Sequence, residues 1–241
     1  MDLADGLSIS VLTAAAAIGF VHTLLGPDHW VPFVTLARVQ NWSHGRTLAI
    51  VAACGVAHVL GSALLGTLGL AAGAAIGNIE AFESLRGNFA AWAMVVFGLS
   101  YFAWGLRRAL VASSGYVPHV HGEQVHLHRH GATSHIHGDD AFDADAAQPR
   151  TFWALFLVFV LGPCEPLIPM FVLPASRGRW DIALATIVVF GIVTVATMLV
   201  VTFVALLGVR KIRFGAAERY AHAMAGAAVA VSGLMVIGLE L

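Results

Sequence analysis

Residues 22–33 read His22-Thr-Leu-Leu-Gly-Pro-Asp-His-Trp-Val-Pro-Phe33 and lie inside an apolar run long enough to cross a membrane. Ionisable side chains are costly at membrane depth, so they usually have a function there. Gly26-Pro27 separates the two histidines, and a proline breaks or kinks a helix because it lacks a backbone donor and clashes with the preceding turn. The stretch therefore predicts a cation site at a helix break. The alternative is a proline kink with polar residues facing a pore.

The composition is typical of a membrane protein. Of the 241 residues, 59% are hydrophobic and only 11% are charged, and the mean hydropathy is +0.81. The net charge of −1 argues against a nucleic-acid partner. We expect the lipid bilayer as surroundings, and the sequence leaves homo-oligomerisation open. Apolar segments of about 20 residues predict six membrane spans, at 8–38 (broken at 26–27), 46–72, 89–110, 152–174, 181–208 and 219–240.

The basic residues predict the orientation in the membrane. If the N-terminus lies outside, the inner loops hold ten of the thirteen Lys and Arg, and the outer segments hold only Arg86, Arg177 and Arg179. Cytoplasmic loops carry the excess of positive charge. Both termini are therefore expected outside a bacterial-type inner membrane, with the long middle loop in the cytoplasm.

The second half of the chain repeats the first at an offset of 136 residues (26 to 162, and 55 to 191). Gly26-Pro-Asp-His29 aligns with Gly162-Pro-Cys-Glu165, and Gly55-Val-Ala-His58 aligns with Gly191-Ile-Val-Thr194. Three spans per half is an odd number, so the halves would lie inverted in the membrane, as in many transporters, with the site near the midplane.

The predicted fold is therefore an all-α membrane protein. Six transmembrane helices form two inverted three-helix repeats with broken first and fourth helices. Residues 1–110 form the first repeat, 111–150 a His-rich loop, and 151–241 the second repeat.

The repeat also nominates the site. Imidazole suits zinc, copper, iron and nickel, and the candidate metal residues of the first half are His22, Asp28, His29 and His58. At equivalent depth the second half offers Cys164, Glu165 and Thr194. A lone membrane histidine such as His58 can instead bond a neighbouring helix. Cys164 can be a small apolar residue, and Glu165 can be a proton or metal carboxylate or the partner of an arginine.

The loop between the halves contains seven histidines, mostly in His-x-His pairs: His119, His121, His126, His128, His130, His135 and His137. Such tracts bind divalent metals through neutral imidazole. The loop has few apolar residues, so it is predicted to be disordered without metal. We expect a metal buffer or sensor, because the spacing specifies no fixed geometry. A solubilising linker is the alternative.

These residues together resemble the nickel/cobalt transporter superfamily, in its efflux and urease-associated branches. The resemblance rests on His-x5-Asp-His in a broken first span, Gly-x-x-His in the second span and the His-rich loop. The resemblance covers the first two spans well and the rest of the chain only by topology. The importers of this superfamily carry His-x4-Asp-His, in which the spacing from His to Asp is one residue shorter than from His22 to Asp28. It implies that His22, Asp28, His29 and His58 recognise nickel or cobalt, although imidazoles also serve zinc, iron and copper. Efflux is favoured over uptake.

Two other functions stay open. Gly162-Pro163-Cys164 resembles the Pro-Cys motif of membrane thiol–disulfide reductant conduits. A dithiol cycle needs two sulfurs that can meet, and the first-repeat counterpart of Cys164 is Asp28, with Cys54 in another span. Transport of another small ion or of a sulfur oxyanion is the second alternative. We expect no enzyme activity and no prosthetic group. The expected transport mechanism is alternating access, in which Glu165 couples proton movement to the movement of the substrate.

Overall fold

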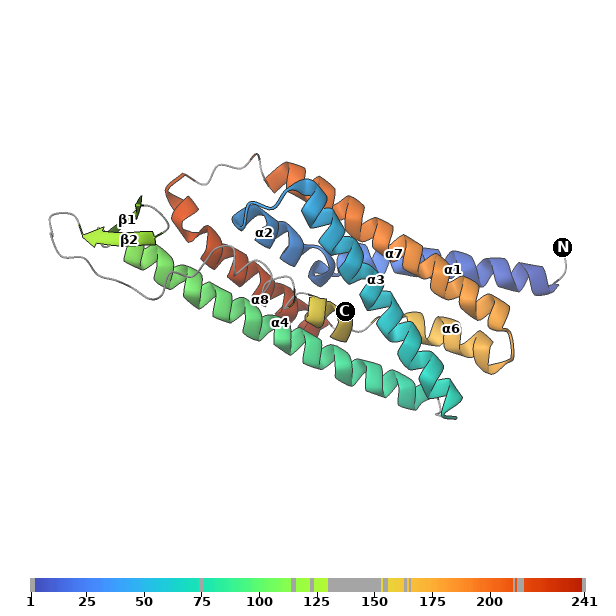
Figure 1. Cartoon of the computed structure of the whole chain (residues 1–241). Helices are drawn as coiled ribbons and strands as arrows, with labels where there is room; N and C mark the ends of the chain where they lie inside the picture. Colours follow the sequence, from blue (N-terminus) through green and yellow to red (C-terminus); the bar gives the residue numbers. More distant parts are fainter. Residues whose placement is uncertain are drawn as a thin grey trace.

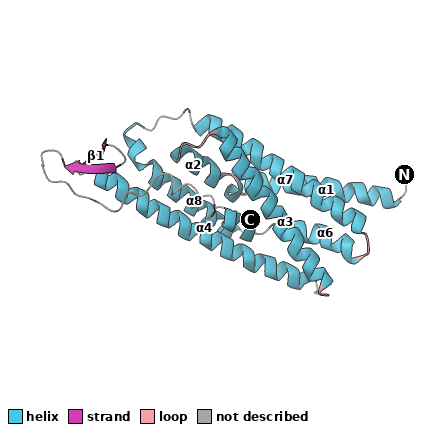
Figure 2. Ribbon diagram, in the orientation of Figure 1, coloured by secondary structure: helices cyan, strands magenta, loops and turns pink. Residues whose placement is uncertain are grey.

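The computed structural model describes residues 3–73, 76–113, 116–121, 124–129, 153, 156–162, 164, 166–209, 211 and 215–239. It is a helical bundle with one short hairpin at its end (Figures 1 and 2). The elements in chain order are α1 (Leu3–Leu25), η1 (Pro27–His29), α2 (Val31–Val39), α3 (His44–Ala71), α4 (Ile76–Ser113), β1 (Tyr116–His121), β2 (Gln124–Arg129), α6 (Leu167–Ser176), α7 (Trp180–Val209), η2 (Gly215–Tyr220) and α8 (Ala221–Leu239).

Five helices among the described residues are long and apolar enough to cross a membrane: Ser8–Leu25, His44–Ala71, Gly77–Val111, Trp180–Val209 and Glu218–Leu239. Their outer faces are apolar; Leu60, Leu64 and Leu68 on one face of α3 are each more than half exposed. A water-soluble surface would carry polar side chains there. The chain is therefore a membrane-embedded helical protein.

The predicted fourth span, 152–174, differs from the other five. Its described part is helical at 156–161 and again in the ten-residue α6, with a bend at Gly162 between the two. Neither piece alone is long enough to cross a bilayer. Prolines cannot continue the hydrogen-bonded ladder of a helix, and Pro163 and Pro166 fall in this gap.

The first span is broken as predicted. α1 ends at Leu25, and Gly26 has an extended backbone with φ −75° and ψ 102°. Pro27 then begins the single turn η1, and Trp30 (φ −139°) separates this turn from α2. Proline is accepted at the start of a helical turn because the first amides there have no intrahelical acceptor. Gly-Pro thus ends one helix and starts the next.

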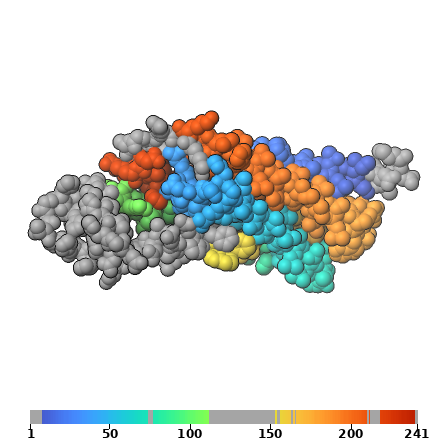
Figure 3. Space-filling model, turned by 45° about the horizontal axis from the view of Figure 1, so that its top comes forward, coloured from blue at the N-terminus to red at the C-terminus, as the bar shows by residue number. Residues whose placement is uncertain are grey.

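Long-range packing joins the two halves of the chain. α4 lies along α8, and α1 and α3 both lie against α7 (Figure 1); Figure 3 shows α3 beside α7 on one face of the molecule. The α4–α8 contact is very close: a Cβ added at Gly226 would lie 2.3 Å from the Phe102 backbone nitrogen. Small residues allow membrane helices to approach in this way.

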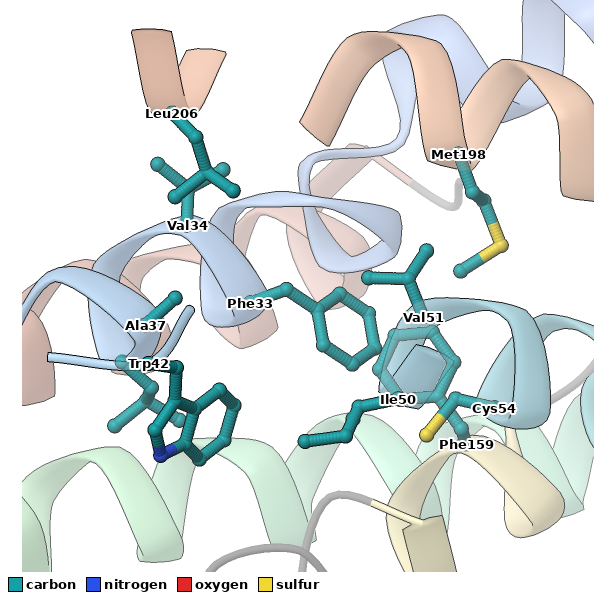
Figure 4. Packing of buried hydrophobic residues seen from close by; sticks show 11 residues of the cluster. Phe33, Val34, Ala37, Trp42, Ile50, Val51, Cys54, Phe159, Met198 and Leu206 are labelled. Carbon is teal, nitrogen blue, oxygen red and sulfur yellow. The ribbon is translucent and has the colours of Figure 1, made fainter. Parts of the chain in front are cut away.

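A buried apolar cluster fixes the broken span beside its neighbours (Figure 4). Phe33 of α2 is fully buried with its ring 4.7 Å from that of Phe159, in the second half of the chain. Val51 of α3 and Met198 of α7 belong to the same cluster. Because α2, α3, α7 and residues 156–161 share this core, the chain following the helix break is held in place by packing.

Part of the His-rich loop has a described backbone. β1 pairs with β2 in antiparallel register, with His119 opposite His126 (Figure 2). α4 continues to Ser113, so the segment between the halves begins slightly later than expected. The side chains of His119, His121, His126 and His128 are not described, and His130, His135 and His137 lie outside the described residues.

Candidate metal centre

Three histidines from three different elements converge at the helix break. His22 lies in the last turn of α1, His29 in η1 and His58 in the middle of α3. Each offers one ring nitrogen, and these atoms all lie within 4.8 Å of one another. The ring centroids are 4.7 Å apart for His22 and His29, and 5.2 Å apart for His29 and His58.

The break itself brings the first two imidazoles together. In a continuous helix, residues seven apart are separated by a rise of about 10.5 Å along the axis. Here the chain folds back at Gly26, whose N–H donates to the His22 carbonyl (2.8 Å) and whose own carbonyl accepts from the His29 N–H (3.2 Å). The sequence predicted a cation site at this break, and the break brings the two imidazoles closer together than a continuous helix would.

Hydrogen bonds orient two of the three rings. The Asp28 carboxylate lies 3.1 Å from His29 Nδ1, and the Phe159 carbonyl lies 3.3 Å from His58 Nδ1. A carbonyl oxygen and an ionised carboxylate can only accept, so each Nδ1 carries the proton and donates. The Nε2 lone pairs of His29 and His58 are therefore free to ligate, which is the usual arrangement around a metal-binding histidine.

The Nε2 atoms of His22, His29 and His58 are all buried and, within the described part of the chain, have no hydrogen-bond partner. Buried polar atoms almost always have a partner, so three such atoms on three neighbouring imidazoles call for an explanation. Ligands at about 2.0–2.1 Å from a tetrahedral metal stand about 3.3 Å apart. The donor atoms, all within 4.8 Å, need to close by at most about 1.5 Å to hold one ion.

Next to the cluster is a small cavity of about 30 Å³, lined by Asp28, His58, Gly87, Met94, Phe159 and Gly162, among others. A water molecule needs roughly 10–15 Å³ of such space. The cavity therefore has room for one or two water-sized species beside His58. The Asp28 side chain is 26% exposed, so its carboxylate lies at the edge of this cavity while it accepts the hydrogen bond from His29.

The second half supplies walls and hydrogen bonds to the site. Cys164 is fully buried, donates its N–H to Ser62 Oγ (3.0 Å), and is outside the three-histidine group. Thr194 is buried on α7, where a Cβ at Gly19 of α1 would lie 3.4 Å from its hydroxyl. Glu165 lies outside the described residues. The Phe159 carbonyl is the second-half contribution that the sequence analysis missed.

The predicted start of the third span at residue 89 was wrong. α4 begins at Ile76, thirteen residues before the predicted span at 89, so Arg86 lies within the third membrane helix. It pairs with Glu83, whose side chain is 1% exposed (N···O 2.8 Å). Opposite charges three residues apart share one helix face. That spacing was the signal in the sequence that this segment belonged to the helix.

Comparison with known proteins gives no match: no protein-family model, no curated protein and no solved structure is significantly similar to this chain.

Proposed function

We propose that the protein carries a divalent transition metal across the membrane, with His22, His29 and His58 as its binding site. The observation that carries this proposal is the convergence of three buried imidazoles whose Nε2 atoms have no hydrogen-bond partner among the described residues. Imidazole nitrogen selects borderline transition metals over magnesium or calcium. The resemblance of His22-x5-Asp28-His29 to the nickel/cobalt transporter superfamily favours nickel or cobalt as the substrate, with zinc, iron and copper next, and efflux as the direction.

Asp28 has two roles in this proposal. It keeps His29 in the tautomer that presents Nε2, and it supplies the negative charge that three neutral imidazoles lack. Two inverted repeats, each with a broken helix, would rock about this site and open it to either side in turn. The bacterial-type inner membrane, the outside termini and the cytoplasmic metal-buffering loop belong to the same proposal.

The thiol-conduit alternative receives little support. Cys54 and Cys164 are both unpaired and buried, and they belong to different core clusters of the described residues. A dithiol cycle requires the two sulfurs to meet. We therefore propose no thiol chemistry.

The test measures nickel, cobalt, zinc, iron and copper accumulation in cells with and without the protein. His22→Ala, His29→Ala and His58→Ala should each reduce the change in accumulation by roughly 10- to 100-fold, the loss seen when even indirect metal contacts are removed. His44→Ala is the matched control, since His44 lies at the start of α3 and outside the three-histidine group. Normal transport by His22→Ala/His29→Ala would overturn the proposal.

A further inference from the structure

A second and larger cavity, about 510 Å³, lies between α4 and α6. Glu80, Glu83 and Ser84 line it from α4, and Pro166, Ile168 and Pro169 line it from the other side. Its lining residues lie near the first turns of α4 and of α6. Two carboxylates, those of Glu80 and Glu83, line this cavity, and the charge of Glu83 is balanced by Arg86.

A buried ion pair forms the inner side of this cavity. Arg86 contacts Glu83 at 2.8 Å, and the two side chains are 13% and 1% exposed. The same guanidinium donates to Ser62 Oγ of α3 (2.6 Å) and to the Gly162 carbonyl (3.1 Å). Arg86 therefore ties α4 to α3 and to the bend in the second broken segment.

The pair also stands between the two cavities. Glu83 lines the larger one, whereas Gly87, next to Arg86, lines the smaller one together with His58 and Gly162. Gly162 adjoins both Arg86 and the histidine site: its carbonyl accepts from Arg86, and a Cβ added to it would lie 3.4 Å from His58 Nδ1. Arg86 and Gly162 therefore join the wall of the larger cavity to the residues around the histidines.

We propose that Glu83 is a second cation-binding position on the transport route, and that Arg86 occupies and closes it while the metal is absent. A divalent cation reaching Glu83 displaces the guanidinium, which releases Ser62 and the Gly162 carbonyl and opens the passage toward His58. The exchange replaces one cation by another on Glu83, so this buried carboxylate stays compensated, while the released guanidinium turns into the larger cavity, where water can solvate it. This proposal rests on the proposed metal transport.

The two native cysteines provide a readout that does not depend on transport. The Cys164 N–H shares the Ser62 hydroxyl with Arg86, so Cys164 reports opening at the pair. Cys54 is equally buried, in the cluster around Phe33, and its labelling reports a general loosening of the helical bundle. The Cys54→Ser variant keeps Cys164 as its single thiol, and the Cys164→Ser variant keeps Cys54. Each purified full-length variant is reacted with a small cationic methanethiosulfonate.

Arg86→Gln and Glu83→Gln should each speed the labelling of Cys164 by about tenfold or more, because removing one partner of a buried pair strongly destabilises its closed arrangement. The labelling rate of Cys54 should stay unchanged. Asp181→Asn, which breaks the exposed Arg179–Asp181 pair, should change neither rate. Equal acceleration of both thiols, or of neither, would overturn the proposal.

Cobalt flux into proteoliposomes then tests Glu83 as a cation position. Glu83→Gln should lower the flux by about tenfold or more, on the scale of losing one metal contact, while Asp181→Asn keeps the wild-type flux. If His29→Ala abolishes flux and Glu83→Gln does not reduce it, the Glu83 proposal fails alone. If the wild-type protein moves neither cobalt nor nickel, the proposed function fails, and the labelling rates still decide whether Arg86 closes the passage.

Discussion

Gly26→Ala is the substitution that most directly tests the geometry of the site. A Cβ at this position would lie 2.5 Å from His29 Nδ1, 2.8 Å from the Asp28 carboxylate and 2.9 Å from the His22 carbonyl. The backbone angles of Gly26, φ −75° and ψ 102°, suit alanine as well as glycine. The substitution therefore adds no backbone strain, and its effect comes from the added methyl group alone.

The size of the effect follows from these distances. Non-bonded heavy atoms sit at about 3.5–4.0 Å, so a carbon at 2.5 Å pushes the His29 ring away by about 1 Å or more. Ligand distances must be correct to about 0.2 Å. Asp28 is pushed at the same time, which weakens the bond that orients His29. We expect metal affinity to fall by about 10- to 100-fold, or ~1.4–2.7 kcal/mol.

The assay is calorimetric titration of the purified full-length protein with nickel and cobalt, together with its thermal midpoint without metal. Gly45→Ala is the matched control, because a Cβ there meets nothing within 4 Å in the described structure. In helix α3 that change should raise the stability by up to about 1 kcal/mol and leave metal affinity unchanged.

Unchanged metal affinity in Gly26→Ala would refute the reasoning, since the methyl group cannot occupy that position with His29 in place. A protein that binds metal normally but has lost thermal stability would also count against it. In that case Gly26 would serve the helix break rather than the histidines.

Three further predictions concern pH, packing and the loop. Metal affinity should fall as the pH is lowered below 7, because a protonated imidazole cannot ligate and binding must then displace protons; titrations at successively lower pH check this, and an affinity that stays constant until the protein unfolds would count against imidazole ligands. Gly226→Ala places a Cβ 2.3 Å from the Phe102 backbone nitrogen and should lower stability by ~1–3 kcal/mol in thermal denaturation, whereas Gly208→Ala, open for 4 Å around, should not. Replacing the seven loop histidines by Ser should shift the metal concentration for half-maximal transport and leave transport in place; complete loss would make the loop part of the route.

The helix break and its two histidines were predictable because their cause is local. Gly26 and Pro27 end the helix through backbone chemistry that depends on a few adjacent residues. His58 was nominated from a repeat in the sequence, and the structure places it in the same cluster. Spans of uniform apolar composition were equally readable, since length and hydropathy alone define them.

The features that the sequence analysis missed come from contacts between distant residues. The Phe159 carbonyl that orients His58 is 101 positions away in the sequence. Every residue has a backbone carbonyl, so the identity of residue 159 could not indicate that this one binds His58. By contrast, the break in the fourth span was predicted from the alignment of Gly162 with Gly26, and the structure has its bend at Gly162. The predicted third span began at 89 and left Arg86 outside it, although Arg86 pairs with Glu83 one turn earlier in the same helix.

Charge compensation connects the two proposed positions. Asp28 is held by His29 and Glu83 by Arg86, so both carboxylates already have a cationic or donor partner. A divalent ion bound by three neutral imidazoles beside one carboxylate keeps a net charge of about +1, and its binding is therefore only partly compensated. A carrier must bind its ion well enough to admit it and weakly enough to release it. At the histidine site the single carboxylate Asp28 leaves the ion partly uncompensated, which suits its passage better than its permanent retention.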